Sequence, residues 1–223
     1  MQGFVDRVDA GRRLGAAVAA LDLPEPLVLG LPRGGVVVAA EVARELAAPL
    51  DVIVVRKLGH PQQPELGLGA VAEDGEPVFD AAGLRVSGLT PDDLTDVVAR
   101  EQAECRRRVA AYRGDRAAPT VAGRTVVLVD DGIATGVTAL AALELLSRRA
   151  PDRLVMAAPV GARDAVRRLG AVADEVVVPL TPARFGAVSQ FYDWFDQTSD
   201  AEVVRLLSAG PPPAAPVRAP RSR

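Results

Sequence analysis

Residues 126–138, which read Val126-Val127-Leu128-Val129-Asp130-Asp131-Gly132-Ile133-Ala134-Thr135-Gly136-Val137-Thr138, decide the fold of this chain. The four consecutive apolar residues predict a strand that is buried on both faces of a parallel sheet. Two carboxylates follow where that strand ends, and a turn of small residues then leads into a helix predicted over 138–146. We therefore expect a strand, a small-residue turn and a helix N-terminus in immediate succession.

This succession favours an anion-binding site at the turn. Unpaired backbone N–H groups and the positive end of the helix dipole converge there, and glycines let a phosphate come close to the backbone. Thr135 and Thr138 can add hydroxyl donors. Asp130 and Asp131 suit sugar hydroxyls instead, because each ionised carboxylate accepts several O–H bonds. Phosphate donors and diol acceptors one turn apart indicate a ribose 5-phosphate.

The same residues resemble the motif with which type I phosphoribosyltransferases bind 5-phosphoribosyl 1-diphosphate (PRPP). The resemblance implies that Asp130 and Asp131 hold the ribose hydroxyls and act in catalysis. It implies that the 5-phosphate is wrapped by the turn that follows, made of Gly132, Ile133, Ala134, Thr135, Gly136, Val137 and Thr138. The alternative is a generic doubly wound sheet in which one strand happens to end in two aspartates.

A second turn of the same kind occurs near the start of the chain. A strand predicted over 27–31 runs into Pro32-Arg33-Gly34-Gly35, and a helix is predicted over 36–46. Gly34 and Gly35 can expose backbone N–H groups, and Arg33 can bind a diphosphate through two nitrogens. This turn resembles the pyrophosphate loop of the family, which implies diphosphate binding by Arg33, Gly34 and Gly35 and a cis Pro32–Arg33 peptide. The alternative is an ordinary turn with a solvated arginine.

Residues 57–66 contain two prolines and no apolar period, so we expect a loop there, between strands predicted over 51–55 and 68–72. In the family a mobile loop at this place closes over PRPP, and a basic residue at its base touches the diphosphate. Lys57, the only lysine of the chain, fits that catalytic role by resemblance. His60 and Glu65 could reach the reaction centre on closure, although a solvated loop residue explains His60 better.

Strands alternate with helices from residue 27 to residue 178, which predicts an α/β fold with a doubly wound, mainly parallel sheet. We expect a single phosphoribosyltransferase-like domain over 1–209, with 1–20 and 180–209 as candidates for the small hood of the family. The Pro-, Ala- and Arg-rich tail 210–223 is expected to be disordered. Further elements are predicted at 3–20 (helix), 77–80 (strand), a helix beginning at Thr90, 154–160 (strand), 162–169 (helix), 175–179 (strand) and 199–207 (helix).

The segment 185–197 concentrates the aromatic residues of the chain. In the family a hood stacks the acceptor base, and Phe191, Tyr192 and Trp194 are the candidates for stacking here. The alternative, which we slightly prefer, is that these rings attach the C-terminal segment to the core.

Composition excludes several classes of protein. A net charge of −3 argues against nucleic-acid binding through bulk positive charge, and one cysteine and one histidine exclude a disulfide framework and a histidine-rich zinc site. The first residues lack the basic head and apolar run of a signal peptide, and no stretch has the length of a membrane span. We therefore expect a cytoplasmic protein that binds neither membranes nor nucleic acid.

The resemblance implies transfer of the phosphoribosyl group of PRPP to a nitrogen of a small, nucleobase-like acceptor, with release of pyrophosphate. It implies Mg²⁺ held largely by PRPP itself, with Asp130 and Asp131 as candidate ligands, and a homodimer is a further candidate. Enzymes for 6-oxopurines carry a third acid where this chain has Ala134, so the turn is closer to the adenine type and the acceptor stays open. The alternatives are a PRPP-sensing regulator without transferase activity and a module that binds a phosphorylated sugar.

Overall fold

A parallel sheet of five strands forms the centre of the computed structural model, which describes residues 3–72 and 77–209, without the side chains of 64 and 65. The predicted disordered tail lies outside the described residues. The strand order is β2-β1-β6-β7-β8, so the strand that carries residues 126–129 is central, as predicted. The strands are β1 (Pro26–Gly30), β2 (Leu50–Val52), β6 (Thr125–Val129), β7 (Arg153–Ala157) and β8 (Glu175–Val177).

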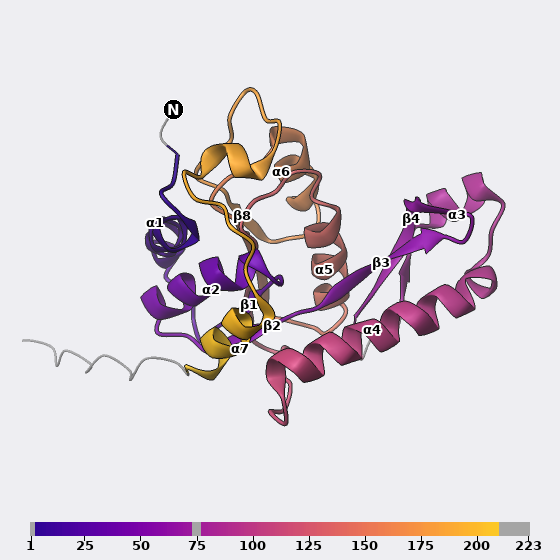
Figure 1. Ribbon diagram of the computed structural model, residues 1–223, viewed down its shortest axis with the longest axis horizontal. Coiled ribbons are helices and arrows are strands. Elements are labelled where there is room, and N and C mark those ends of the chain that lie inside the picture. Colours follow the sequence, from indigo (N-terminus) through magenta and orange to yellow (C-terminus); the bar gives the residue numbers. More distant parts are fainter. Residues whose placement is uncertain (1–2, 73–76, 210–223) are drawn as a thin grey trace, which may run out of the picture.

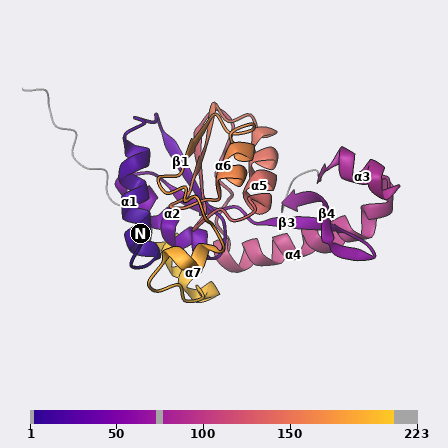
Figure 2. The ribbon, with the colours of Figure 1, turned by 90° about the horizontal axis from the view of Figure 1, so that it is seen from above.

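Helices cover both faces of this sheet (Figures 1 and 2). Helices α1 (Arg7–Ala19) and α2 (Gly34–Glu45) lie on one face, and α5 (Val137–Ser147) and α6 (Arg163–Leu169) lie on the other. Successive side chains of a strand point to opposite faces, and in β6 Val126 and Leu128 pack towards α5 and α6 while Val127 and Val129 pack towards α1 and α2. The predicted doubly wound parallel fold is confirmed.

An arm projects from one edge of the sheet (Figures 1 and 2). It is built from the antiparallel strands β3 (Val55–His60), β4 (Gln63–Ala72) and β5 (Val78–Phe79), the helix α3 (Ala81–Ser87), a 3-10 turn (Pro91–Leu94) and the long helix α4 (Thr95–Arg113). The arm has a small apolar core of its own, in which Leu58, Leu68 and Val71 of the hairpin pack against Leu84 of α3 and Val97 of α4.

The loop expected at 57–66 is therefore wrong. Val55 lies opposite Ala72 and Lys57 opposite Ala70 in an antiparallel ladder, with irregular register around Gly59. The apolar partners that stabilise this hairpin come from α3 and α4, later in the chain. The sequence of the hairpin itself therefore lacks the apolar period that would predict its strands. The predicted strand over 51–55 is likewise divided between β2 and β3, whereas the short strand predicted at 77–80 is present as β5.

The segment that precedes α1 lies beside the segment around Tyr192. Phe4 and Tyr192 form a parallel bridge, their rings are 5.4 Å apart, and Phe4 N–H donates to the carbonyl of Phe191 at 2.8 Å. The capping segment includes a 3-10 turn (Val188–Phe191), and α7 (Asp200–Ser208) then packs against α4. The segments expected to form a hood thus share one small apolar cluster.

A buried ion pair attaches α4 to the edge strand of the sheet. Arg113 Nε donates to Asp51 Oδ2 at 3.0 Å, and a terminal nitrogen of Arg113 donates to the carbonyl of Val52 at 3.2 Å. Both side chains are less than a tenth exposed. Removing one partner of such a pair leaves an uncompensated buried charge.

We predict that Arg113→Met lowers the free energy of unfolding by about 3–5 kcal/mol in urea denaturation, because Asp51 loses its buried cation. Arg106→Met, an exposed change on the same helix, should cost less than about 0.5 kcal/mol. Adding Asp51→Leu to Arg113→Met should recover part of the loss. Equal small losses for both single variants would contradict the anchoring role.

Candidate functional site

The two glycine-containing turns follow neighbouring parallel strands and touch each other. Gly30 at the end of β1 is paired with Val129 at the end of β6, and Leu31 N–H donates to the carbonyl of Val129 at 2.9 Å. A Cβ placed on Gly34 would lie 2.0 Å from Asp131 Oδ2, and one on Gly35 would lie 2.9 Å from the Cα of Asp130. Only glycine fits at these two positions. The Pro32–Arg33 peptide is cis, as expected.

The turn after β6 encloses a pocket of about 160 Å³ that is lined by Asp130 and by Gly132 to Ala139. Gly136 has φ +73°, which glycine adopts without strain, and it caps the start of α5. Ile133 is buried, and its backbone N–H and carbonyl are bonded to Val160 and Ala162 at 2.9 and 2.8 Å. Thr135 and Thr138 are exposed. This pocket has the backbone and helix-terminus geometry of an anion site.

The two carboxylates have different surroundings. Asp130 Oδ1 accepts the N–H of Asp131 at 2.8 Å, and Asp130 lines the pocket. Burial, and then the negative charge of Asp131, raises the pKa of Asp130 well above its ordinary value. Asp131 Oδ2 instead accepts a hydrogen bond from Arg7 Nε at 2.7 Å, with the two side chains 16% and 12% exposed. The pair thus combines a carboxyl that favours its proton with a carboxylate that has a cation beside it.

Arg7 is a residue of this site that sequence reasoning missed. It is the first residue of α1, whose N-cap Asp6 accepts the N–H of Asp9 at 2.8 Å. Its guanidinium lies 3.9 Å from the centre of the Phe195 ring and donates to the carbonyl of Asp196 at 2.7 Å. Arg7 therefore links Asp131 to the start of α1 and to the segment 195–196. The partners are too far apart in sequence for any spacing to reveal them.

The three aromatic candidates for stacking differ in exposure: Phe191 and Tyr192 are buried, and Trp194 is exposed. Phe191 and Tyr192 are buried in the cluster with Phe4, so they attach the C-terminal segment to the core, the alternative that the sequence favoured slightly. Tyr192 also donates its O–H to the carbonyl of Asp131 at 2.5 Å, and burial raises the pKa of this phenol. Its hydroxyl thereby braces the acid pair. Trp194 is 68% exposed, and of the three rings it alone has an open face for stacking.

The two basic residues expected at the diphosphate lie elsewhere. Arg33 lines a different pocket from the one that Asp130 lines, and a terminal nitrogen of Arg33 lies 3.7 Å from Asp200 Oδ1 on α7. Lys57 is exposed on β3 within the arm, its stem beside Gly67. His60 accepts the N–H of Gln62 at 3.1 Å in the hairpin turn, which is a structural role. Glu65 lies among the residues whose side chains are not described.

Arg168 is another cation beside the turn after β6. A terminal nitrogen of Arg168, on α6, donates to the carbonyl of Thr135 at 2.8 Å.

In the part of the chain that the structure describes, no three His, Cys, Asp or Glu side chains gather as metal ligands. None of the helices described is long and apolar enough to cross a bilayer.

Comparisons with known proteins identify the family. The model of the phosphoribosyl transferase domain matches residues 10–179, so this chain belongs to that family. Two Mycobacterium tuberculosis proteins, from strains CDC 1551 and H37Rv and phosphoribosyl transferases by name alone, are each 49% identical over 207 residues, which is 93% of this chain and 47% of theirs. The chain thus spans about half the length of these curated relatives. A crystal structure of a Thermus thermophilus protein is 46% identical, with a TM-score of 0.85 over 92% of this chain and 97% of that one.

The raised pKa of Asp130 predicts how the stability of the fold changes with pH. The folded state keeps the Asp130 proton to higher pH than the unfolded chain, so this group lowers stability as pH rises above the ordinary aspartate range. Asp130→Asn cannot titrate. The variant without ligand should therefore melt at a higher temperature than the natural chain at neutral pH, and the difference should shrink towards pH 4. A difference that does not change with pH would contradict the assignment.

Proposed function

We propose that this chain binds PRPP between its two turns and transfers the phosphoribosyl group to a nitrogen of a nucleobase-like acceptor, releasing pyrophosphate. The observation that carries the proposal is the contact between the turns, in which Gly34 and Gly35 lie against Asp131 and Asp130. Asp130 also lines the pocket suited to a phosphate, so the two carboxylates suited to a diol adjoin both that pocket and the turn suited to a diphosphate. Family membership supports the same chemistry.

Each turn would bind one end of PRPP. The 5-phosphate would occupy the pocket of residues 132–139, where it accepts backbone N–H bonds at the start of α5. The diphosphate would lie against the backbone of Gly34 and Gly35, because the Arg33 side chain turns towards Asp200. The backbone can come this close to a ligand because the glycines carry no side chain.

The acid pair would hold the ribose. Asp131, with Arg7 beside it, can accept a hydroxyl hydrogen, and Asp130 in its protonated form can donate as well as accept. Fixing the sugar orients C1 towards the acceptor, and negative charge nearby favours the positive charge that develops there as the bond to the diphosphate breaks. The diphosphate leaves with the bonding electrons, the acceptor nitrogen forms the new bond to C1, and its proton passes to pyrophosphate or water.

The carboxylate of Asp131, and that of Asp130 once a nearby cation displaces its proton, are oxygen ligands of the kind that Mg²⁺ prefers, and two carboxylates fit an ion that arrives on PRPP rather than one held by a complete protein cage. Bound there, Mg²⁺ would neutralise charge on the diphosphate. Trp194 is the exposed ring that we propose for stacking against the acceptor. The acceptor itself stays open, because this chain has Ala134 where the enzymes for 6-oxopurines carry a third acid.

The test measures binding and transfer separately. Calorimetry with PRPP and MgCl₂ is followed by measurement of pyrophosphate release across a panel of nucleobases. Asp130→Asn with Asp131→Asn should weaken PRPP binding by about a hundredfold or more, because the charge-assisted hydrogen bond to Asp131 and the hydrogen bonds of the Asp130 carboxyl are lost. The control is Asp152→Asn with Asp164→Asn, two exposed aspartates, which should change the affinity by less than about twofold.

The outcomes separate the alternatives. Binding together with pyrophosphate release for one acceptor supports a transferase. Binding without release for any acceptor would leave a PRPP sensor. Unchanged affinity in the variant of Asp130 and Asp131 would contradict the site itself.

A further inference from the structure

A second pocket, of about 240 Å³, lies beside the Pro32–Arg33 turn, and neither Asp130 nor Asp131 is among its described lining residues. It is lined by Pro32 and Arg33 after β1, by Arg107, Arg108, Ala111 and Tyr112 of α4, and by Asp200 at the start of α7. Among the described residues, the two pockets have no lining residue in common. Three guanidinium groups from two distant parts of the sequence therefore surround one small cavity.

The two helices that line this pocket, α4 and α7, are positioned by buried contacts with each other. Tyr112 is buried with Val203 and Leu207 of α7, which packs α7 against α4. The Tyr112 hydroxyl donates to Asp200 Oδ1 at 2.8 Å, and burial, followed by this bond, raises the pKa of the phenol. The phenol therefore keeps its proton and adds no negative charge to the pocket.

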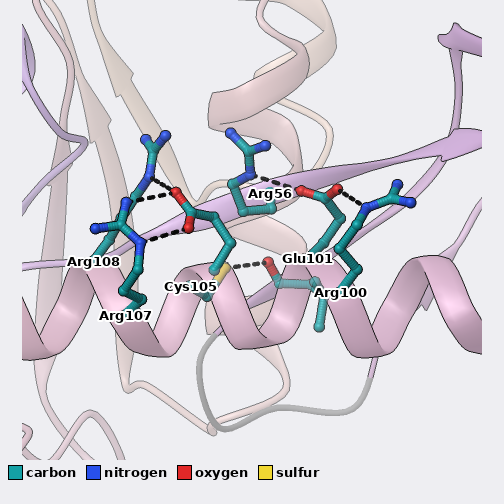
Figure 3. Close-up of polar contacts among 8 residues, drawn as sticks. Arg56, Arg100, Glu101, Cys105, Arg107 and Arg108 are labelled. Atoms are coloured by element: carbon teal, nitrogen blue, oxygen red, sulfur yellow. Dashed lines mark hydrogen bonds and ion pairs between the residues drawn. The ribbon is translucent and has the colours of Figure 1, made fainter.

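The two α4 arginines are bonded to one glutamate and still have unused N–H donors. Glu104, one turn earlier on α4, accepts from Nε and a terminal nitrogen of Arg107 at 2.7 and 2.9 Å and from Nε of Arg108 at 2.8 Å (Figure 3). These bonds lower the pKa of Glu104 to about 2, so it stays ionised. A guanidinium has five N–H donors, so both arginines keep N–H groups that these bonds do not use.

The charges in and around the pocket do not cancel. Arg33, Arg107 and Arg108 face Asp200, the acidic residue among the described lining, while Glu104 binds the two α4 arginines from outside that lining. The Arg33–Asp200 contact is long, at 3.7 Å, and its side chains are 43% and 63% exposed. Exposed pairs of this kind contribute little, so a stronger anion can displace Asp200 from Arg33.

We propose that this pocket binds a small inorganic phosphate anion, pyrophosphate or orthophosphate, at a site separate from the PRPP site. Arginine forks match the oxygens of a phosphate in pairs, which a single carboxylate such as Asp200 satisfies less well. The cavity is smaller than the roughly 300–1,000 Å³ of pockets for larger organic ligands, which favours the inorganic ion over a nucleotide. Residues 32–35 connect the two sites, because Pro32 and Arg33 line this pocket while Gly34 and Gly35 lie against the acid pair.

The test titrates inorganic pyrophosphate, and orthophosphate in a second arm, into the full chain at low salt, with and without saturating PRPP and MgCl₂. The natural chain should bind the anion saturably in both conditions. Arg107→Ala with Arg108→Ala should weaken the affinity for pyrophosphate by about tenfold or more, because charge-assisted hydrogen bonds are lost. The matched control is Arg106→Ala, an exposed arginine next in sequence, which should change it by less than about twofold.

Two further variants sharpen the test. Asp200→Asn should tighten pyrophosphate binding by about threefold or more, since it removes the competing carboxylate. Arg107→Lys with Arg108→Lys keeps the charge and loses the fork, so it should weaken binding even where the alanine variant does not fold.

The outcomes also separate this site from the proposed function. The alanine variant of Arg107 and Arg108 should leave PRPP affinity unchanged, and the variant of Asp130 and Asp131 should keep its pyrophosphate binding in this pocket. An equal loss in Arg106→Ala, or pyrophosphate binding abolished by PRPP, would overturn the proposal.

Discussion

The close approach of two backbone turns at the ends of β1 and β6 is the constraint on which the rest of this structure depends. Parallel pairing of Gly30 with Val129 puts both turns at one edge of the sheet. The glycines at 34 and 35 then allow the first turn to touch the carboxylates of the second, where any side chain would collide with them. In open α/β sheets, ligands bind outside the carboxyl ends of the strands, and both turns lie there.

The acid pair is stabilised from outside the sheet. Arg7 comes from the first helix and is covered by Phe195, while the hydroxyl of Tyr192 holds the carbonyl of Asp131. The first helix and the segment around Tyr192 thus both contact Asp131. Beside it, burial and the negative charge of Asp131 raise the pKa of Asp130, and we expect this group to lower stability at neutral pH, a cost that the rest of the fold offsets.

Much of the sheet could be predicted from the sequence because its signals are local. The apolar run 126–129, the acids after it and the small-residue turn are contiguous, and so are Pro32-Arg33-Gly34-Gly35. The antiparallel hairpin of β3 and β4 could not be predicted, because the residues that bury Leu58 and Leu68 lie on α3 and α4. For the same reason the loop predicted to hold Lys57 beside the diphosphate is a strand of the arm instead.

The parts of the site that the sequence did not reveal all depend on tertiary contacts. Arg7 meets Asp131 across 124 positions, and Arg107 and Arg108 of α4 line one pocket with Arg33, which lies more than 70 positions earlier in the sequence. The contiguous motifs at 32–35 and 130–138 predicted the backbone of the candidate site. Side chains that come from other elements became visible only in the folded chain.

The most direct test of this account is a crystal structure of the chain grown with PRPP and MgCl₂. We expect the 5-phosphate against residues 132–138, the ribose hydroxyls within hydrogen-bond distance of Asp130 and Asp131, and the diphosphate along the backbone of Gly34 and Gly35. PRPP bound away from the acid pair, or with its two phosphate ends outside these turns, would contradict the account.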